Sequence, residues 1–403
     1  MPLTARALAW ALIPLAAVAA LAQSQADHEQ GQGSGVAQSR DAYPWNLPNG
    51  FPTPRVPADN PMTRQKVRLG WYLFYDARLS ANQTQSCASC HQQARAFTDG
   101  KPVAIGSTRE AHPRSAMSLA NVAYYSSLTW ANPGMTRLED QALVPMFGDH
   151  PIELGLAQGG SQMLTRLRAE PVYQRLAAAA FPDEADPFTL PNVTRALASF
   201  ERSIISGRSP YDRYHFDHDE SAISAAAKRG EELFNSPALS CSRCHSGFNF
   251  SLATDFEGRR GEADDEGGFR NTGLYNVKGP FSYPAPNTGL YAITKRPADM
   301  GKFRVPTLRN IALTAPYMHD GSIATLEDVL AHYAAGGRTI ANGANVGVGH
   351  DNPNKSPLVR GFPLSTDQRD DLIAFLKTLT DPTLVSDPQL NDPWAEYGNR
   401  GVR

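Results

Sequence analysis

The sequence predicts a mainly α-helical fold in two similar domains, with long loops and little β-structure. One observation is a unit that occurs twice: a helical stretch containing G-x-x-L-F, a short loop, and then S-C-x-x-C-H. A second is apolar periodicity close to that of a helix in the stretches around these units. The third is composition, since 32 glycines and 31 prolines in 403 residues are typical of a protein with many loops. A repeat of this kind predicts two domains built on one plan.

The two C-x-x-C-H motifs contain every cysteine of the chain. They consist of Cys87, Cys90 and His91 in the first copy and Cys241, Cys244 and His245 in the second. Two thiols at this spacing can form thioethers to the two vinyl groups of one porphyrin, and the histidine that follows can bind the iron. Two local disulfides or one zinc site are alternatives, but neither needs a histidine directly after each pair. The motifs therefore predict two covalent c-type haems, one in each of two cytochrome c-like domains.

Length and charge limit the classes of function. At 403 residues the chain can hold two domains, each with its own core. The 38 basic and 40 acidic side chains give a net charge of −2. Neither a nucleic-acid partner nor an anionic membrane surface is indicated by that balance.

The N-terminus predicts export. Arg6 precedes an apolar run at residues 7–21, and Ala20-Leu21-Ala22 is a small-x-small cleavage pattern. Because the run is short for a bilayer span, residues 1–22 are predicted to be a cleaved signal peptide, with an uncleaved anchor as the alternative. We then expect a periplasmic protein without stable membrane insertion, which suits covalent haem attachment. Residues 23–45 are predicted to be a disordered leader.

Residues 46–212 are expected to form the first domain. Asn60 and Pro61 fit the N-cap and N1 positions of a helix that carries the first G-x-x-L-F. A later helix is predicted where apolar residues recur at i, i+4, i+7 and i+11. These residues are Val193, Leu197, Phe200 and Ile204. The polar stretch at residues 209–221 is predicted to be the linker.

Residues 213–403 are expected to form the second domain and a C-terminal tail. Residues 246–300 are rich in Gly, Asp and Pro, which predicts a long loop region with a short hairpin. Ser365 and Gln368 can form a capping box in front of a last helix. The proline-rich segment after residue 381 is expected to wrap the surface.

The ligands of the second iron decide its chemistry, and Met, His, Tyr or an empty position are the choices for its sixth site. Thr325 can cap a helix on which four residues share one buried face. They are Leu326, Val329, Leu330 and Tyr333. His332 is turned about 100° away from that face. Tyr333 is therefore the predicted ligand, His332 is its rival, and a buried tyrosine that binds no iron is the structural alternative.

Three long segments resemble the bacterial di-haem cytochrome c peroxidase and MauG family. They are LGWYLFYDARLSANQTQSCASCH, LTWANPGMTRLEDQALVPMFGDHPIELG, and FRNTGLY with FRVPTLRNIALTAPYMHDGSIATLEDVLAHY. The phrases LTWANP, QALVPMFG and SDPQLNDPW are similar to the MauG-like branch, in particular to its MbnH-type members. The resemblance covers nearly all of the chain beyond the predicted signal peptide.

The resemblance implies that the haem on His91 is open on one side, where hydrogen peroxide binds. Gln141 and Glu153 match the family's distal glutamine and acid–base glutamate, and Pro145 matches a proline that lines this pocket. Trp130 matches a tryptophan placed between the two haems. Without the resemblance, Gln141 and Glu153 would be read as surface groups and Trp130 as a core residue.

The resemblance also implies one Ca²⁺ between the haems, with Thr314 and Pro316 matching its backbone ligands. His319 matches a histidine near the same interface. Tyr333 follows fourteen residues after His319, where the peroxidases have methionine and MauG has an axial tyrosine. This match supports Tyr333 as the ligand on grounds independent of helix periodicity.

The chain departs from the family pattern at three places. The peroxidases' distal histidine falls near Ser107, with His112 out of register, which argues for a haem that is open at rest. The calcium-binding asparagine falls near Ser115. The tryptophan through which MauG passes oxidising equivalents to its substrate corresponds to Leu239, so that route must differ here.

The resemblance predicts an oxidoreductase that uses hydrogen peroxide to form a bis-ferryl state, shared through Trp130, and oxidises an aromatic residue of a partner protein. In MbnH-type enzymes it implies a tryptophan that is converted to kynurenine, often in a copper-handling system. One alternative is a conventional di-haem peroxidase that takes electrons from a c-type cytochrome. The other is an electron carrier without enzymatic activity.

Overall fold

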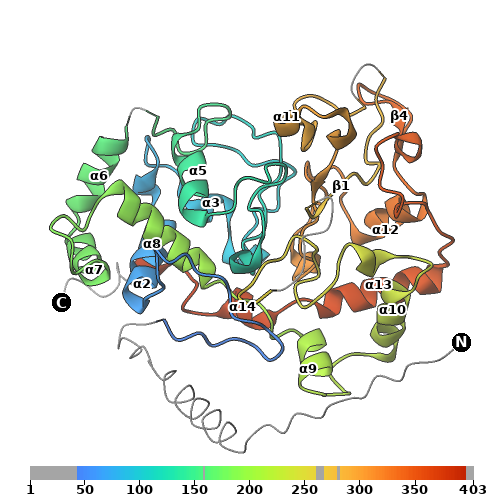
Figure 1. The fold of residues 1–403 in the computed structure, drawn as a ribbon, viewed down its shortest axis with the longest axis horizontal. Coiled ribbons are helices and arrows are strands. Elements are labelled where there is room, and N and C mark those ends of the chain that lie inside the picture. The colour runs from blue at the N-terminus through green and yellow to red at the C-terminus, as the bar shows by residue number, and fades with distance from the viewer. Residues whose placement is uncertain (1–42, 158, 260–266, 279–281, 396–403) are drawn as a thin grey trace, which may run out of the picture. The chain divides into compact units, whose positions relative to one another are not determined.

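The protein is mainly helical, as predicted, and long irregular loops join its helices (Figure 1). The computed structural model describes residues 43–157, 159–259, 267–278 and 282–395, which belong to one compact unit. The helices are α2 (Arg64–Phe74), α3 (Cys87–Cys90), α4 (Leu138–Gln141), α5 (Leu143–Phe147), α6 (Gly160–Arg168), α7 (Pro171–Ala180), α8 (Leu190–Arg202), α9 (Pro210–Phe216), α10 (Ala225–Asn235), α11 (Tyr291–Thr294), α12 (Leu326–Ala334), α13 (Thr366–Thr378) and α14 (Pro382–Ser386). The strands are β1 (Phe269–Arg270), β2 (Phe303–Arg304), β3 (Thr339–Ile340) and β4 (Gly347–Val348), paired antiparallel as β1–β2 and β3–β4.

Two main hydrophobic clusters form the interior. The first lies mostly within residues 69–204 and the second mostly within residues 211–379. Leu384 and Leu390 of the C-terminal tail pack into the first cluster, and Trp394 packs against it. Conversely, Trp130 and Ala131 come from the first half of the sequence but pack in the second cluster. Each half of the sequence therefore contributes side chains to the core of the other half.

The two G-x-x-L-F stretches lie on α2 and α10, and each of these helices crosses a partner helix at very short range (Figure 1). A Cβ atom on Gly70 would lie 1.9 Å from the carbonyl oxygen of Ala196 in α8. One on Gly230 would lie 2.0 Å from the carbonyl oxygen of Asp371 in α13. The repeat keeps glycine at this position because only a residue without a side chain lets the two backbones approach so closely.

The phenylalanine of each repeat fills the crossing next to its glycine. Phe74 packs against Phe200 of α8 with 5.1 Å between the ring centroids. Phe234 packs against Phe375 of α13 at the same distance. The two halves of the chain therefore use one packing scheme around their C-x-x-C-H motifs, as the sequence repeat predicts.

The predicted start of the first helix is wrong by three residues. Thr63, not Asn60, is the N-cap of α2, and its side chain accepts the N–H of Lys66. Asn60 is fully buried, where its amide donates to Glu139 Oε1 at 2.7 Å and to the carbonyl oxygen of Arg195 at 3.0 Å. Asn and Thr are both favoured at the N-cap. Thr63 takes this position because the side chain of Asn60 is bound to residues far away in the sequence.

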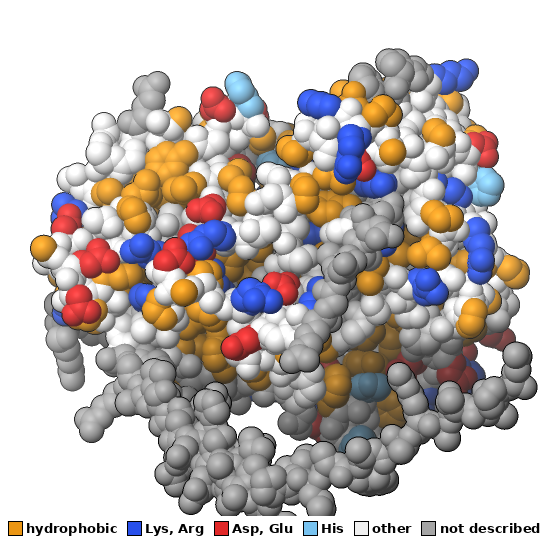
Figure 2. Space-filling model, in the orientation of Figure 1, with side chains coloured by type: hydrophobic (Ala, Val, Ile, Leu, Met, Phe, Trp, Pro, Cys, Tyr) orange, Lys and Arg blue, Asp and Glu red, His pale blue; other side chains and the backbone are white. Residues whose placement is uncertain are grey.

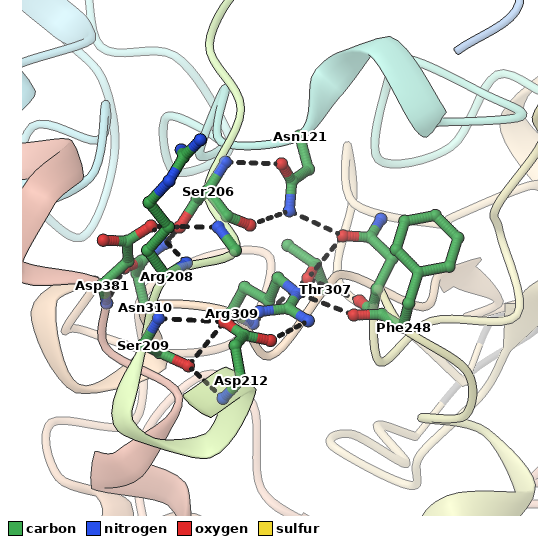
Figure 3. A network of polar contacts seen from close by, with 12 residues as sticks. Asn121, Ser206, Arg208, Ser209, Asp212, Phe248, Thr307, Arg309, Asn310 and Asp381 are labelled. Atoms are coloured by element: carbon green, nitrogen blue, oxygen red, sulfur yellow. Dashed lines mark hydrogen bonds and ion pairs between the residues drawn. The ribbon is translucent and has the colours of Figure 1, made fainter. Parts of the chain in front are cut away.

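The predicted linker at residues 209–221 is also wrong, because it begins with helix α9. Ser209 and Asp212 form the capping box of this helix. The Asp212 carboxylate also accepts two hydrogen bonds of 2.9 Å from the buried guanidinium of Arg309, as Figure 3 shows. A segment that is polar in sequence is therefore held in the interior by an ion pair.

Three other predicted elements are confirmed. The apolar stripe at residues 193–204 is buried on α8 and just beyond its end. Thr325 caps α12, and Ser365 with Gln368 forms the capping box of α13. The short hairpin expected within residues 246–300 is not found in the described part of that stretch: β1 lies there, but it pairs with β2 at residues 303–304, after an intervening segment that contains α11.

The predicted signal peptide and residues 23–42 of the predicted leader lie outside the described residues. Tyr43, near the end of the predicted leader, donates its N–H to the carbonyl oxygen of Met62 at 3.2 Å. Within the described ranges, no helix combines the length and the apolar character needed to cross a bilayer. Acidic and basic side chains are interspersed over the face in Figure 2, in line with the nearly balanced net charge.

Candidate functional site

The histidines of the two C-x-x-C-H motifs have the same backbone partner. Nδ1 of His91 lies 2.9 Å from the carbonyl oxygen of Phe97. Nδ1 of His245 lies 3.1 Å from the carbonyl oxygen of Phe250. A carbonyl at Nδ1 holds the ring proton there and fixes the ring, which leaves Nε2 free to bind iron.

The four cysteines of the two motifs are half-buried, and none is joined to another in a disulfide. Burial raises the pKa of Cys90 and of Cys241 to about 11. In the described part of the chain, no three His, Cys, Asp or Glu side chains come together in a group that could hold a metal ion. The two motifs are therefore not brought together into one four-cysteine site, and each pair of thiols is placed as thioether attachment to a porphyrin requires.

The second motif opens into a cavity of about 1460 Å³, counted with its opening to solvent. We call it the larger cavity. Cys241, Cys244 and His245 form part of its wall. Apolar side chains of α12 and α13 form much of the remainder, namely Leu326, Val329, Leu330, Leu372 and Leu376. A wide apolar cavity with two thiols and a free imidazole nitrogen in its wall fits a covalently attached porphyrin.

Tyr333 lines the larger cavity together with His245, on the same face of α12 as its apolar neighbours. Burial raises the pKa of its phenol well above the usual value. His332 is also buried but does not line this cavity, and burial lowers its pKa to about 4. Of the two rival ligands, Tyr333 is therefore the one that faces the space next to His245.

The residues expected around the first haem come from three consecutive segments. Gln141 ends α4, and Pro145 lies in α5. The N–H of Leu154 donates to the carbonyl oxygen of Pro145 at 2.8 Å, which brings the segment of Glu153 back against α5. The N–H of Ser107 donates to the carbonyl oxygen of Glu153 at 2.7 Å. Backbone hydrogen bonds therefore hold Pro145 and Glu153 together.

The side chain of Glu153 is the acidic group of this pocket. Burial raises its pKa to about 7. Its charge in turn raises the pKa values of Cys87 and Cys90, so the carboxyl lies near the first haem motif. A carboxyl with this pKa can both accept and return a proton near neutral pH.

Trp130 lies between the larger cavity and a smaller neighbouring one, and it lines both of them. Its Nε1–H donates to the carbonyl oxygen of Ser115 at 3.0 Å. Its own carbonyl oxygen accepts the N–H of Arg304 at 2.8 Å. The indole is thus held by its ring and by its backbone in the wall that separates the two cavities.

The smaller cavity collects the residues predicted to hold calcium. Thr314 and Pro316 line it, together with Ser115 at the position of the family's asparagine. His319 lies in the wall of the larger cavity and stacks on Phe303 with 3.6 Å between ring centroids. Since the described residues contain no group of three or more acidic or histidine ligands, a cation here would depend largely on backbone oxygen atoms, with Asp99 as the carboxylate in the wall.

Comparison with known proteins gives the family. Residues 64–221 match the family model described as "Di-haem cytochrome c peroxidase". The methylamine utilization protein MauG of Methylorubrum extorquens is 33% identical over 394 residues, which cover 95% of this chain and 97% of that protein. The chain belongs to the di-haem cytochrome c peroxidase and MauG family.

Two other family members show its range. The cytochrome-c peroxidase IdrP1 of Pseudomonas sp. (strain SCT) is 35% identical over 376 residues, covering 88% of this chain and 91% of that protein. The crystal structure of a MauG-like protein associated with microbial copper homeostasis is 46% identical, with a TM-score of 0.84. It covers 88% of this chain and 100% of its own. Both peroxidase and MauG names therefore occur among the relatives.

Membership of this family implies two c-type haems and oxidoreductase activity. The chain fits both cofactors. Each motif supplies two thiols and one histidine whose Nδ1 is held by a backbone carbonyl, and the second motif faces a wide apolar cavity.

Two buried charged residues near the motifs escaped the sequence analysis. Arg304 lines both cavities, and the signal was an arginine inside the apolar stretch before Pro306. Glu201 is buried at the end of α8, its Oε2 has no partner, and burial raises its pKa to about 8. The signal there was a carboxylate directly after the buried Phe200, which sequence alone cannot distinguish from a solvated helix end.

Proposed function

We propose that this di-haem enzyme uses hydrogen peroxide to oxidise an aromatic side chain, a tryptophan, on a partner protein. The observation that carries the proposal is the presence of Tyr333 in the wall of the cavity that also contains Cys241, Cys244 and His245. The MauG-like relative associated with copper homeostasis supports the same branch of the family.

The residue at the sixth position of the second iron separates the two kinds of family member. A methionine thioether raises the iron potential and suits a haem that receives electrons from a cytochrome. A phenolate is a hard anionic oxygen and favours the more oxidised iron. Tyr333 therefore suits a site that stores oxidising power until a substrate reaches it.

Glu153 is proposed to act on the peroxide in the first haem pocket. Splitting the O–O bond requires a proton to move from the inner oxygen to the outer one. With a pKa of about 7, the Glu153 carboxylate accepts this proton and returns it to the departing oxygen. The amide of Gln141 would hydrogen-bond the peroxide without titrating, and Pro145 would make that side of the pocket apolar.

Trp130 is proposed to connect the two cofactors. Bound at the two motifs, the haems supply the reaction with peroxide and the storage of its two oxidising equivalents. The indole of Trp130 lines both cavities and is fixed by its bond to Ser115, so it is a rigid aromatic bridge between them. In the overall reaction, H2O2 takes two electrons and two protons to give two water molecules; the partner's aromatic side chain supplies both, and one water molecule adds to the oxidised ring to give a hydroxylated product.

The point at which electrons enter from the partner is not the family's usual tryptophan. Leu239 stands at that position and lines the larger cavity. An aliphatic side chain cannot carry an electron hole, so transfer through this position must be direct tunnelling. We also propose a periplasmic location, and Ca²⁺ in the smaller cavity with Thr314 and Pro316 as ligands.

A second candidate is a conventional peroxidase that oxidises a c-type cytochrome. The relative named cytochrome-c peroxidase IdrP1, 35% identical, favours it. The two functions differ in their electron donor and not in the reaction with peroxide.

The test is a donor competition with the haem-loaded enzyme and hydrogen peroxide. One arm contains reduced cytochrome c, and the other contains a candidate partner protein with an exposed tryptophan. We expect slow cytochrome oxidation and a mass increase at one tryptophan of the partner. Rapid cytochrome turnover without modification of any partner residue would assign the second function instead.

A further inference from the structure

Arg304 is a fully buried cation that lacks an anionic partner. It is 2% exposed, and its Nε and Nη1 atoms have no hydrogen-bond acceptor. Its remaining contacts are with neutral groups: Nη2 lies 3.8 Å from Met117 Sδ, and Tyr125 contacts the guanidinium through its hydroxyl and through its ring, whose centroid lies 4.1 Å away. A guanidinium remains protonated in proteins. Burial of its charge without a counter-ion therefore has a large free-energy cost.

Arg309, five residues later, is a buried arginine whose charge is paired within the protein. It is 1% exposed, and each of its three side-chain nitrogen atoms donates a hydrogen bond. Nη1 and Nη2 donate to the two carboxylate oxygens of Asp212 at 2.9 Å each, and Nε donates to the carbonyl oxygen of Phe248 at 2.7 Å (Figure 3). Among the described residues no carboxylate pairs with Arg304 in this way, which points to an anion that is not part of the polypeptide.

The position of Arg304 identifies the kind of anion. Its side chain lies in the wall of the larger cavity, whose other walls contain Cys241, Cys244 and His245. It also lines the smaller cavity, so it stands beside Trp130 at the boundary between the two. Its backbone is held firmly there, because it belongs to β2 and donates its N–H to the Trp130 carbonyl oxygen.

We propose that Arg304 binds a propionate carboxylate of the haem in the larger cavity through Nε and Nη1. Each c-type haem carries two propionates on its rim, and a planar guanidinium with two free donors matches a carboxylate. The described residues that line this cavity include no aspartate or glutamate. The inference needs only the haem that family membership implies, and it holds whichever electron donor the enzyme uses.

Arg304 is then a positioning residue with an electrostatic effect. Its positive charge stabilises the reduced iron relative to the oxidised iron and keeps the propionate ionised. Removing the charge should lower the reduction potential of the second haem. It should also raise the pKa of the propionate, so that the potential becomes dependent on pH.

The experiment compares haem-loaded wild type with Arg304→Met, Arg304→Lys and the control Arg114→Met. Arg114 is half-buried with its guanidinium 5.8 Å from the ring of Phe303, but it is bonded to Asn287 and lines neither cavity. The reduction potential of the second haem is measured by optical titration from about pH 5 to about pH 8. We expect a lower potential and a new pH dependence for Arg304→Met, partial recovery for Arg304→Lys, and the wild-type profile for Arg114→Met.

Two outcomes would overturn the proposal. One is an unchanged potential and pH profile in both Arg304 variants with both haems in place. The other is a wild-type potential that shifts when chloride is removed, because a free inorganic ion would then occupy the guanidinium. If Arg304→Met does not retain haem, Arg304→Lys is compared with wild type by the propionate bending modes in the resonance Raman spectrum. Unshifted modes there count against the assignment.

Discussion

Gly230 and Asp371 mark the closest approach of α10 and α13, where an added Cβ would lie only 2.0 Å from a carbonyl oxygen. The same relationship holds between Gly70 and Ala196 at 1.9 Å. A short sequence signal, G-x-x-L-F, thus reports a backbone contact that occurs once in each half of the chain.

Substituting Gly230→Ala should force α10 and α13 apart, because the obstacle is backbone and cannot rotate away. Overpacking of this kind costs about 1–3 kcal/mol and occasionally more. Thermal unfolding of the haem-loaded protein measures the loss. The control is Gly134→Ala, whose Cβ would meet only Asn132 Oδ1 at an ordinary 3.4 Å. Equal stability of the two variants would show that the helices can separate freely.

Asp212→Asn should destabilise the protein by about 3–5 kcal/mol, because it leaves the buried Arg309 without its counter-ion. Chemical denaturation of the haem-loaded protein gives the change in free energy of unfolding. Asp219→Asn is the matched control, since Asp219 is paired with the exposed Arg213 at 3.8 Å. No measurable change is expected there. A small effect at Asp212 would mean that water enters and solvates Arg309.

Local signals in the sequence were sufficient for much of this protein. The C-x-x-C-H spacing, the i, i+3, i+4, i+7 face of α12 and the capping box at Ser365 depend on residues close together in the chain. Those elements agree with the structure. The face of α12 even separates Tyr333, which lines the cavity, from His332, which does not.

Long-range partners account for what the sequence did not reveal. Asn60 looks like a helix cap but is bound to Glu139, 79 residues away. Asp212 looks like part of a linker but is paired with Arg309, 97 residues away. Arg304 is distinctive only because it lacks such a partner, and that can be seen only when the packing around it is known.

The reaction with hydrogen peroxide should speed up as the pH rises through about 7. Burial raises the pKa of Glu153 to about 7, so its carboxyl is neutral below that pH and ionised above it. Only the ionised form accepts a proton from peroxide. Stopped-flow rates should therefore rise with pH and then level off. A rate that falls as the pH rises would assign the acid, and not the base, as the active form.

Glu153→Gln should slow the reaction with peroxide by about 10²–10⁴-fold, because the amide cannot accept a proton. It should also remove the rise in rate near pH 7. Asp149→Asn is the control, since Asp149 is an exposed carboxylate on the same turn. If both variants react at the wild-type rate, another group must serve as the base.

Tyr333→Met should raise the reduction potential of the second haem and increase the rate at which cytochrome c is oxidised. A neutral thioether stabilises reduced iron, whereas a phenolate stabilises oxidised iron. His332→Phe should leave both properties unchanged, because His332 is buried away from the larger cavity. The potential is measured by optical titration, and low-temperature EPR reports whether the second iron remains low-spin. If His332→Phe changes the EPR spectrum and Tyr333→Met does not, the imidazole is the ligand. Storage of oxidising equivalents at this haem would then not be expected.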